Sequence, residues 1–326
     1  MSESKEQKYP CDDCGDDYKE FWRWNEKIIF IPEFNNPIEE YYSIISNYSY
    51  LVFSNYNWIN HCDKLNKTDF DNSHGKCQCD GECGYVGSKF NYSVKELPDN
   101  ITRLVFGFYF NQPVQLNSNL THLEFDYYFN QPIQLNSNLT HLVLGTSFNQ
   151  PIQLNSNLTH LTIGWDFNHP IQFNSNLTHL THYNYYYYYI HYYRLPESLE
   201  FLELTSCDDN IINNLPDRIE ELVLGVGFDS KLSNLPNQLK KLTILNYTYV
   251  GELDELGDGI EELVIYNNVQ LDNLPSSLKK LIIKNKNYSK ELNNLPKNLE
   301  YLELSDQYNL QIKNIPSNLK ISKVRY

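Results

Sequence analysis

The stretch FNQPVQLNSNLTHLEFDYYFNQPIQLNSNLTHLVLGTSFNQPIQLNSNLTHLTIGWDFNHPI, from Phe110 to Ile171, decides the fold. It contains four copies of one unit, because Phe110, Phe129, Phe148 and Phe167 follow one another at intervals of 19 residues. A fixed period of about 20 residues is typical of a solenoid, in which each repeat packs only on its neighbours. The period therefore predicts stacked coils, although a chain of 326 residues would otherwise suggest several globular domains.

The same unit extends over much of the chain as the pattern L-x-x-L-x-L. The second and third apolar residues of each unit, such as Leu123 and Phe125, alternate with variable residues. A period of two predicts a short strand with one buried face. The first apolar position recurs every 18 to 22 residues, at Ile101, Leu120, Leu139, Leu158, Leu177, Leu199, Ile219, Leu239, Ile260, Leu278 and Leu299.

The F-N-x-P core predicts what fills the coils. Phe110, Phe129, Phe148 and Phe167 should stack as an aromatic spine. The asparagine after each phenylalanine should form an amide ladder that satisfies backbone groups of the loops. Proline fits a segment that turns away from the sheet, where no ladder N–H is required.

The run F-N-x-P-I beside L-x-x-L-x-L resembles the FNIP repeat, a relative of the leucine-rich repeat found in social amoebae and in giant DNA viruses that infect amoebae. The close match covers roughly residues 90–176. The resemblance implies a right-handed solenoid that binds proteins, and it implies no catalytic residues. We therefore expect a mostly β, leucine-rich-repeat-like fold with a parallel sheet, little helix and about 12–14 short repeats.

After Tyr193 the pattern changes to Leu-Pro-x-x-Leu-x-x-Leu, as at Leu215-Pro216 and Leu235-Pro236. This half is similar to short leucine-rich repeats of the Leu-Pro subtype, including those of secreted bacterial ubiquitin ligases. Those ligases need a catalytic cysteine domain after the repeats. No such domain follows in this sequence, and we do not expect ligase activity.

A further repeat core, Phe34-Asn35-Asn36-Pro37-Ile38, places the start of the array near residue 25. The residues between this part and the resumed pattern at Phe90 then form an insertion, which in a solenoid usually leaves as a surface loop. The predicted organisation is a polar N-terminal tail (1–24), divergent repeats (25–89) with a Cys/His-rich insertion (about 55–88), FNIP-type repeats (90–182), a Tyr-rich junction (183–198) and Leu-Pro-type repeats (199–326).

Charge and hydropathy exclude two classes of partner. The net charge is -15 and the sequence contains no run of Lys and Arg, so we expect no nucleic-acid partner. The N-terminus is polar and acidic, and no stretch approaches the roughly 18 apolar residues of a membrane span. We expect no membrane association and an intracellular, cytoplasmic location, which would be the host cytoplasm if the protein is viral.

The Tyr-rich junction is the predicted contact with a protein partner, because exposed Tyr beside Arg is typical of the residues that dominate binding energy at interfaces. Expansion of a tyrosine codon in a tolerant loop is the alternative. The predicted partner-binding residues are Tyr185, Tyr186, Tyr187, Tyr188, Tyr189, Tyr192, Tyr193 and Arg194.

Six of the seven cysteines lie before residue 84. Three interpretations stay open: a structural zinc site, unpaired reduced thiols, and a disulfide, which a reducing compartment disfavours. We expect no cofactor other than such a zinc ion. The candidate ligands are Cys11, Cys14, Cys77, Cys79 and Cys83.

Two polar columns should lie on the exposed strand face. His122, His141, His160 and His179 precede the second Leu of four successive units, and they form either a metal- or pH-sensitive ladder or a solvated column of repeat residues. Later units alternate in sign at the equivalent places, as in Glu220-Glu221 and Lys240-Lys241. Opposite charges on neighbouring strands should stabilise the register.

We find no phosphate-cradling glycine loop, no G-x-S-x-G and no H-E-x-x-H. The favoured function is a non-enzymatic protein-binding scaffold whose exposed strand face varies over a constant skeleton. The alternative is a substrate-recognition adaptor of a ubiquitin ligase. We disfavour it because residues 1–60 show aromatic, strand-like segments where an F-box would require an apolar helical pattern.

Overall fold

The computed structural model describes residues 21–54, 87–183, 194–207, 209–232, 234–251, 253 and 256–326. The chain divides into two compact units. Unit 1 comprises Met1–Leu139 and Val143–Thr146, and unit 2 comprises Thr140–Leu142 and Ser147–Tyr326. The boundary between them passes through strand β6 (His141–Leu144).

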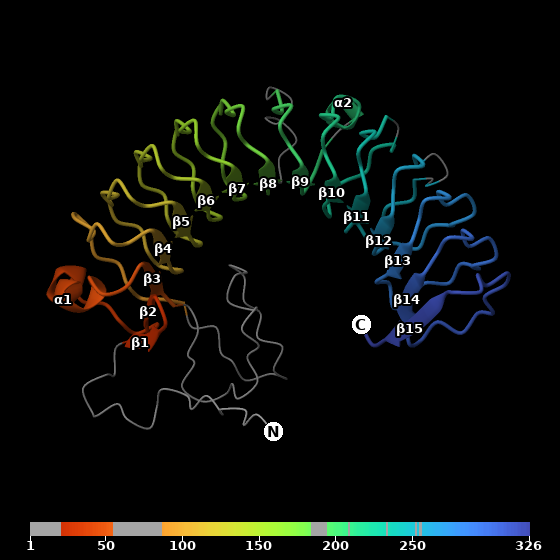
Figure 1. Ribbon diagram of the computed structural model, residues 1–326, viewed down its shortest axis with the longest axis horizontal. Helices are drawn as coiled ribbons and strands as arrows, with labels where there is room; N and C mark the ends of the chain where they lie inside the picture. The colour runs from red at the N-terminus through yellow and green to blue at the C-terminus, as the bar shows by residue number, and fades with distance from the viewer. Residues whose placement is uncertain are drawn as a thin grey trace, which may run out of the picture. The chain divides into compact units, whose positions relative to one another are not determined.

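In unit 1 the strands lie side by side in sequence order (Figure 1). They are β1 (Phe21–Trp24), β2 (Lys27–Phe30), β3 (Tyr50–Phe53), β4 (Arg103–Phe106) and β5 (His122–Phe125). β1 and β2 form an antiparallel hairpin, and from β2 to β5 each strand is parallel to the next. One turn of the coil therefore contributes one strand.

Unit 2 repeats the same arrangement with parallel neighbours from β7 to β15. Its strands are β7 (His160–Ile163), β8 (His179–His182), β9 (Phe201–Leu204), β10 (Glu221–Leu224), β11 (Lys241–Ile244), β12 (Glu262–Ile265), β13 (Lys280–Ile283), β14 (Tyr301–Ser305) and β15 (Lys320–Val324).

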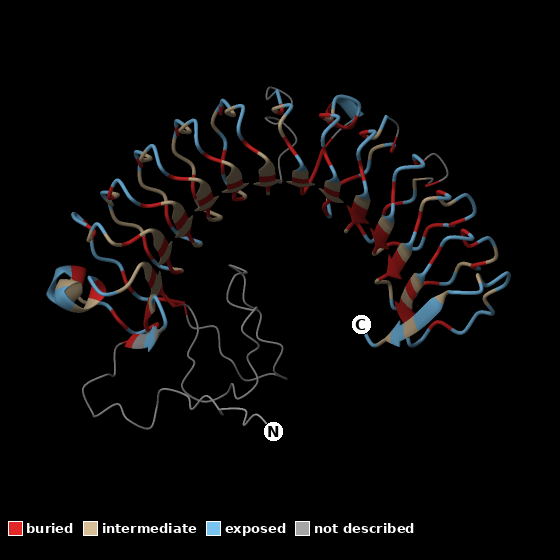
Figure 2. Cartoon of the chain, in the orientation of Figure 1, coloured by how far each residue is buried: buried red, intermediate tan, exposed pale blue. Residues whose placement is uncertain are grey.

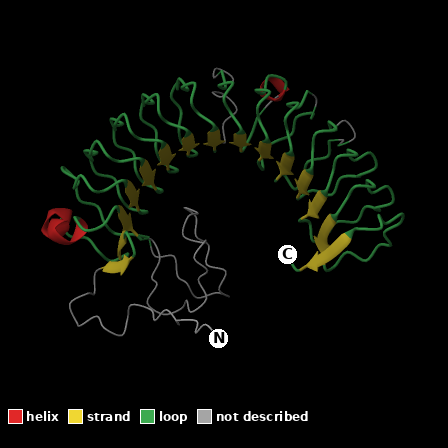
Figure 3. Cartoon of the chain, in the orientation of Figure 1, coloured by secondary structure: helices red, strands yellow, loops and turns green. Residues whose placement is uncertain are grey.

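Helix is scarce in the described residues (Figure 3). A 3-10 helix, η1 (Ile38–Tyr41), runs into α1 (Tyr42–Ile45) in unit 1, and α2 (Asp209–Ile212) lies in unit 2. None of these helices has the length or apolar character needed to cross a bilayer. The predicted fold class, a mostly β, leucine-rich-repeat-like solenoid with a parallel sheet, is confirmed.

The alternation of apolar and variable residues in the sequence corresponds to an alternation of buried and partly exposed residues in the strands (Figure 2). In β4, Leu104 and Phe106 are buried while Arg103 and Val105 are partly exposed. The strands β5 and β7 to β10 follow the same rule. Each of these strands thus has two inward side chains and two outward ones, because successive side chains point to opposite faces.

Two columns of phenylalanine fill unit 1. Phe90, Phe110 and Phe129 stack with ring centroids 5.8 and 5.9 Å apart. The inward residues Phe106 and Phe125 of the strands form a second column and lie 3.8 and 3.6 Å from the ring of Phe110 and Phe129, respectively. The turns are therefore joined through continuous aromatic contact.

The spine position in unit 2 changes from phenylalanine to tyrosine along the chain. Phe148 stacks on Phe167 at 6.1 Å, and Tyr288 packs on Tyr308 at 6.0 Å. The two hydroxyl groups donate hydrogen bonds to backbone carbonyls of the preceding turn, Tyr288 to Val269 at 3.1 Å and Tyr308 to Lys290 at 3.0 Å. The buried hydroxyl groups of Tyr288 and Tyr308 are tolerated because each has an acceptor.

The asparagine of the F-N core forms the ladder expected for it. The side-chain oxygen of Asn91 accepts the backbone N–H of Asn111 at 2.8 Å, and Asn111 accepts that of Asn130 at 2.9 Å. Asn149 accepts the N–H of Asn168 at 2.9 Å in unit 2. Each amide thus satisfies a loop donor of the next turn.

A second asparagine ladder has no counterpart in the sequence-based expectations. The side-chain amide of Asn136 donates to the carbonyls of Asn117 at 2.7 Å and Leu120 at 3.0 Å, and its oxygen accepts the N–H of Asn138. Asn174 repeats these contacts two periods further, in unit 2. The repeated N-S-N before each strand therefore ties the loop to the turn before it.

The ordered coil in unit 1 begins earlier than predicted. β1 starts at Phe21, inside the segment expected to be a polar tail, and the buried ring of Phe21 lies 5.4 Å from that of Phe30. The described residues end at Ser54 and begin again at Gly87, and Phe34 stacks on Phe90 at 5.8 Å. Two consecutive turns therefore pack together across the position of the predicted insertion.

One core position of β8 departs from the apolar rule. His182 is 2% exposed and pairs in register with Ile163 and Leu204. Neither of its ring nitrogens has a hydrogen-bond partner. Burial lowers the pKa of His182 to about 4, because the interior penalises the charged imidazolium. The imidazole is therefore neutral at pH 7.

Truncation of the spine should destabilise unit 1 strongly. We expect Phe129→Ala to cost roughly 3–5 kcal/mol, because the cavity would remove contacts with Phe110 and Phe125. Tyr128→Ala, at a 44% exposed neighbour, is the matched control and should cost less than about 1 kcal/mol. Urea unfolding followed by circular dichroism measures both, and equal midpoints for the two variants would contradict the spine.

Candidate functional site

The outward strand positions form straight rows because parallel register places equivalent residues side by side. In unit 2, His160 pairs with His179, and Thr162 pairs with Thr181. The next strand adds Phe201 to the row of His160 and His179, and it adds Glu203 to the row of Thr162 and Thr181. We call these the first row and the third row, after the strand positions from which they come.

The first row of unit 2 begins with an imidazole stack, formed by His141, His160 and His179. Successive ring centroids lie 4.0 Å apart with interplanar angles of 14° and 15°. Phe201 continues the stack at 5.7 Å from His179. The rings thus present their edges outward, while their faces cover one another.

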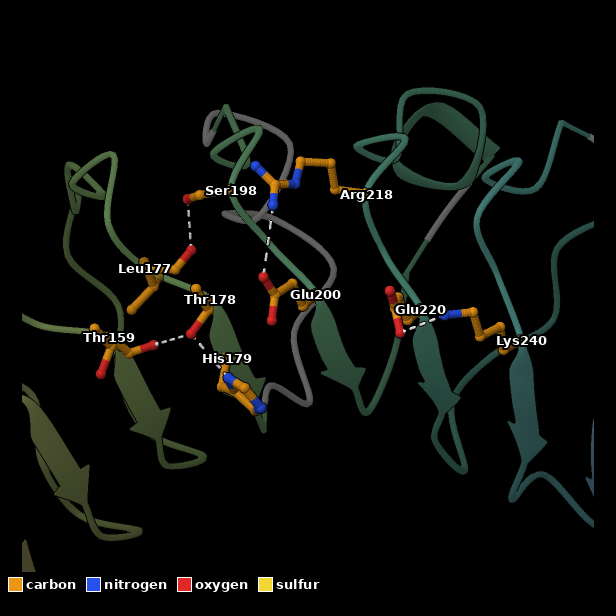
Figure 4. A network of polar contacts seen from close by, with 9 residues as sticks. All are labelled: Thr159, Leu177, Thr178, His179, Ser198, Glu200, Arg218, Glu220 and Lys240. Carbon is orange, nitrogen blue, oxygen red and sulfur yellow. Dashed lines mark hydrogen bonds and ion pairs between the residues drawn. The ribbon is translucent and has the colours of Figure 1, made fainter.

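Threonines hold the stack in place (Figure 4). The Thr159 hydroxyl lies 3.1 Å from the Thr140 carbonyl oxygen and 2.9 Å from Nδ1 of His160. Thr178 repeats this geometry with the Thr159 carbonyl, at 3.2 Å, and with His179, at 2.9 Å. The Thr-His pair of the repeat is therefore one hydrogen-bonded unit that orients each ring.

The stack disfavours charge and metal alike. Burial, together with the neighbouring imidazoles of His141 and His179, lowers the pKa of His160 to about 4. Burial also lowers the pKa of His179, against the opposing effect of the Glu200 and Glu221 carboxylates. Stacked rings are parallel, whereas zinc ligands converge. No group of three or more His, Cys, Asp or Glu side chains in the described residues is arranged to hold a metal ion.

Beyond β9 the first row changes from histidine and phenylalanine to charged residues, and the position before it, which is threonine beside each histidine, is charged as well (Figure 4). Lys240 contacts Glu220 at 2.9 Å and Lys241 contacts Glu221 at 2.7 Å. Lys279 and Lys280 make the same contacts with Glu261 and Glu262, at 2.9 and 3.2 Å. The predicted pairing of opposite charges on neighbouring strands is confirmed. These exposed pairs support the register and leave few charges for a partner.

Unit 1 carries an exposed aromatic cluster, made of Phe108, Tyr109, Tyr127 and Tyr128, in the loops after β4 and β5. Phe108 stacks on Tyr127 at 5.0 Å, and Tyr109 stacks on Tyr128 at 5.6 Å. The two stacks meet edge to face, with Phe108 4.9 Å from Tyr109. The three tyrosines are 45%, 39% and 44% exposed, in sequence order.

Backbone contacts fix the aromatic cluster on the coil. The N–H of Tyr109 donates to the Ser88 carbonyl at 3.2 Å, and that of Tyr128 donates to the Phe108 carbonyl at 3.1 Å. Gly87 lies beneath Tyr109 with a φ of 71°, and a Cβ there would meet the tyrosine ring at 3.0 Å. Glycine is thus required both for the backbone conformation and for the close approach of the ring.

The aromatic cluster was missed by sequence reasoning, which assigned the aromatic contact to the Tyr-rich junction. A signal existed at the two positions before each spine phenylalanine. They hold Phe108-Tyr109 and Tyr127-Tyr128 in consecutive units but Thr146-Ser147 in the next. Since equivalent loop residues of neighbouring turns lie side by side, two aromatic pairs in succession predict a cluster.

The predicted site residues are mostly outside the described part of the chain. Tyr185 to Tyr193 lie outside it, as do Cys11, Cys14, Cys77, Cys79 and Cys83, so partner binding and zinc binding there stay predictions. Arg194 is described, and its exposed guanidinium contacts Glu197 at 3.5 Å. Cys207, the one cysteine after residue 84, is buried in unit 2.

Comparison with known proteins agrees with the repeat architecture. The family model described as FNIP Repeat matches residues 148–181 and 266–304. The crystal structure of CroV588, described as a novel circular LRR protein, aligns with 94% of this chain and 70% of its own at a TM-score of 0.52 and 20% identity. That likeness concerns the fold alone.

A second solved structure, YopM from Yersinia enterocolitica WA-314, aligns with 71% of this chain and 58% of its own, at 21% identity and a TM-score of 0.46. No curated protein matches the sequence. The second FNIP match lies in the half that carries the Leu-Pro pattern, so the family signature occurs on both sides of the Tyr-rich junction.

Acid should destabilise unit 2. The pKa values of His160 and His182, each about 4 in the folded state, lie below the 6.5 of an ordinary imidazole. The unfolded chain therefore binds more protons between pH 6.5 and 4, and stability that is complete above pH 6.5 is lost as the pH falls through this range. For the buried His182 the loss by pH 4 is on the order of 2–3 kcal/mol.

Thermal melting at pH 7, 5.5 and 4 measures this effect. His182→Leu should melt higher than the wild type at pH 7, because it removes an unpartnered buried imidazole, and should lose less stability in acid. His169→Gln is the matched control, since glutamine holds that repeat position at Gln112, Gln131 and Gln150. If wild type and His182→Leu lost the same stability in acid, His182 would not be a source of the acid sensitivity.

Proposed function

We propose that this chain, an FNIP- and leucine-rich-repeat-like repeat protein, is a non-enzymatic scaffold that binds a protein partner. The single observation that carries the proposal is the aromatic cluster of unit 1. Four aromatic side chains are gathered on one surface, and three of them are 39–45% exposed. Such a patch keeps apolar area in contact with water unless a partner covers it.

The chemistry of the aromatic cluster favours a protein surface as its occupant. Tyrosine offers a large, rigid apolar area with a hydroxyl group at its rim, and it is enriched among the residues that dominate binding energy. Mutual stacking holds the rings in place before binding, so little side-chain entropy is lost on association. The net charge of -15 disfavours nucleic acid as a competing stacking ligand.

Loss of the exposed tyrosines should abolish partner capture. In affinity capture from lysate of the cells that express the protein, we expect Tyr109→Ala/Tyr128→Ala to lose the specifically bound proteins by roughly tenfold or more. Tyr247→Ala, at a 62% exposed tyrosine of unit 2, is the matched control and should capture as the wild type does. Quantitative mass spectrometry reads the bound proteins, and an unchanged set in the double variant would refute the proposal.

The Tyr-rich junction remains a second proposed contact with the partner. Replacement of residues 185–193 by a regular repeat segment should weaken capture of the same proteins if both surfaces serve one partner. Capture of an identical set at wild-type levels would remove the junction from the proposal while leaving the aromatic cluster in it.

A further inference from the structure

We propose that the carboxylate of Glu203, on the exposed face of β9, receives an arginine side chain of the protein partner. The inference rests on the proposed scaffold function and adds the chemistry of one contact. It starts from the third row of unit 2, in which Glu203 is the single charge from β7 to β13. The other members of this part of the row are Thr162, Thr181, Val223, Thr243, Val264 and Ile282.

Register leaves the charge of Glu203 without compensation on the sheet. Its partner in β8 is Thr181 and its partner in β10 is Val223. Other glutamates on this face have a lysine on the next strand, as Glu221 has Lys241 at 2.7 Å and Glu262 has Lys280 at 3.2 Å. In the described part of the chain, no lysine or arginine forms an ion pair with Glu203.

The carboxylate is nevertheless held in position. The hydroxyl groups of Thr181 and Tyr183 both donate hydrogen bonds to it. Partial burial raises the pKa of Glu203, with the Glu221 charge acting in the same direction. A desolvated carboxylate that has hydroxyl donors but no cation gains free energy when a cation arrives.

A contrast within the same row supports this conclusion. Glu303 receives the hydroxyl groups of Tyr301 and Tyr326, each at 2.7 Å, and also lies near Lys280 and Lys284. Although burial opposes it, these hydrogen bonds and charges together lower the pKa of Glu303. Its charge is satisfied within the chain, whereas Glu203, in the described part of the same row of unit 2, has no cation beside it.

The surroundings of Glu203 suit a guanidinium group. Phe201 lies two residues before it on the same face of β9, and the ring of Tyr183 stacks on Trp165 at 5.8 Å. A guanidinium group is planar, stacks on aromatic rings and binds a carboxylate through two parallel hydrogen bonds. An ammonium group offers neither the flat face nor the paired donors. Arginine is therefore the side chain that we expect at Glu203.

The test titrates the full chain with N-acetyl-arginine amide and, separately, with N-acetyl-citrulline amide, which has the same shape without the charge. The readout is the methyl resonances of Thr181 and Val223, because these side chains flank Glu203 in register. We expect saturable shifts with the arginine compound and none with the citrulline compound. Glu203→Gln should weaken arginine binding by about tenfold or more.

Glu221→Gln is the matched control, since it removes one charge from the neighbouring strand but affects a glutamate that already has a lysine partner. It should bind arginine as the wild type does. Equal binding by wild type and Glu203→Gln, equal loss in Glu221→Gln, or equal shifts with citrulline would each overturn the inference. If the arginine compound does not bind while Tyr109→Ala/Tyr128→Ala still loses captured proteins, the role of Glu203 is rejected and the proposed scaffold function is retained.

Discussion

Contact between successive turns is the interaction on which the rest of this structure depends. One turn of about 20 residues has a four- or five-residue strand and little else of regular structure, so it cannot enclose its own apolar side chains. The neighbouring turn supplies both the apolar contacts and the hydrogen-bond partners that a single turn lacks. Phe106 and Phe110 cover Phe125 and Phe129 of the next turn, and Asn111 accepts the backbone N–H of Asn130. The same stacking thus buries the apolar side chains and gives the polar groups of the loops their hydrogen-bond partners, and each turn fixes the register of the next.

Interior positions were predictable where a short-range pattern determines them. Alternation in Leu123–Phe125 identified β5, and the interval of 19 residues identified the spine, because both depend on spacing alone. The role of Asn136 was not predictable, since its partners are carbonyls of the preceding turn rather than neighbours in sequence. His182 was missed for a different reason. Alternation says which face a residue occupies, but it does not exclude a polar residue from the interior.

The outward surface was predictable as rows but not as contacts. Counting strand positions places Thr181 and Val223 on either side of Glu203, so the absence of a facing lysine could be found from sequence. The hydrogen bond from Tyr183 could not, because it depends on how the chain leaves β8. The aromatic cluster was predictable as a gathering of residues, from the aromatic pairs before Phe110 and Phe129, but not as two ring stacks. Its two stacks require that the loops after β4 and β5 follow similar paths, and strand periodicity carries no information about loops.

In the proposed scaffold, the difference between satisfied and unsatisfied surface groups determines where partner specificity would arise. A lysine that already contacts a glutamate on the next strand, as Lys241 contacts Glu221, must lose that contact before it can serve a partner. The imidazole stack is similarly occupied, since its ring faces cover one another and Nδ1 of His160 contacts Thr159. Side chains that find no ion pair or apolar cover within the repeat gain the most free energy from binding. Glu203 lacks a cation, and the tyrosines of the aromatic cluster expose apolar area. Because the interior columns maintain the register even at turns whose outward side chains form no ion pair, such exceptions can occur on the outward face without loss of the fold, and a solenoid of nearly uniform turns can still present one distinct surface.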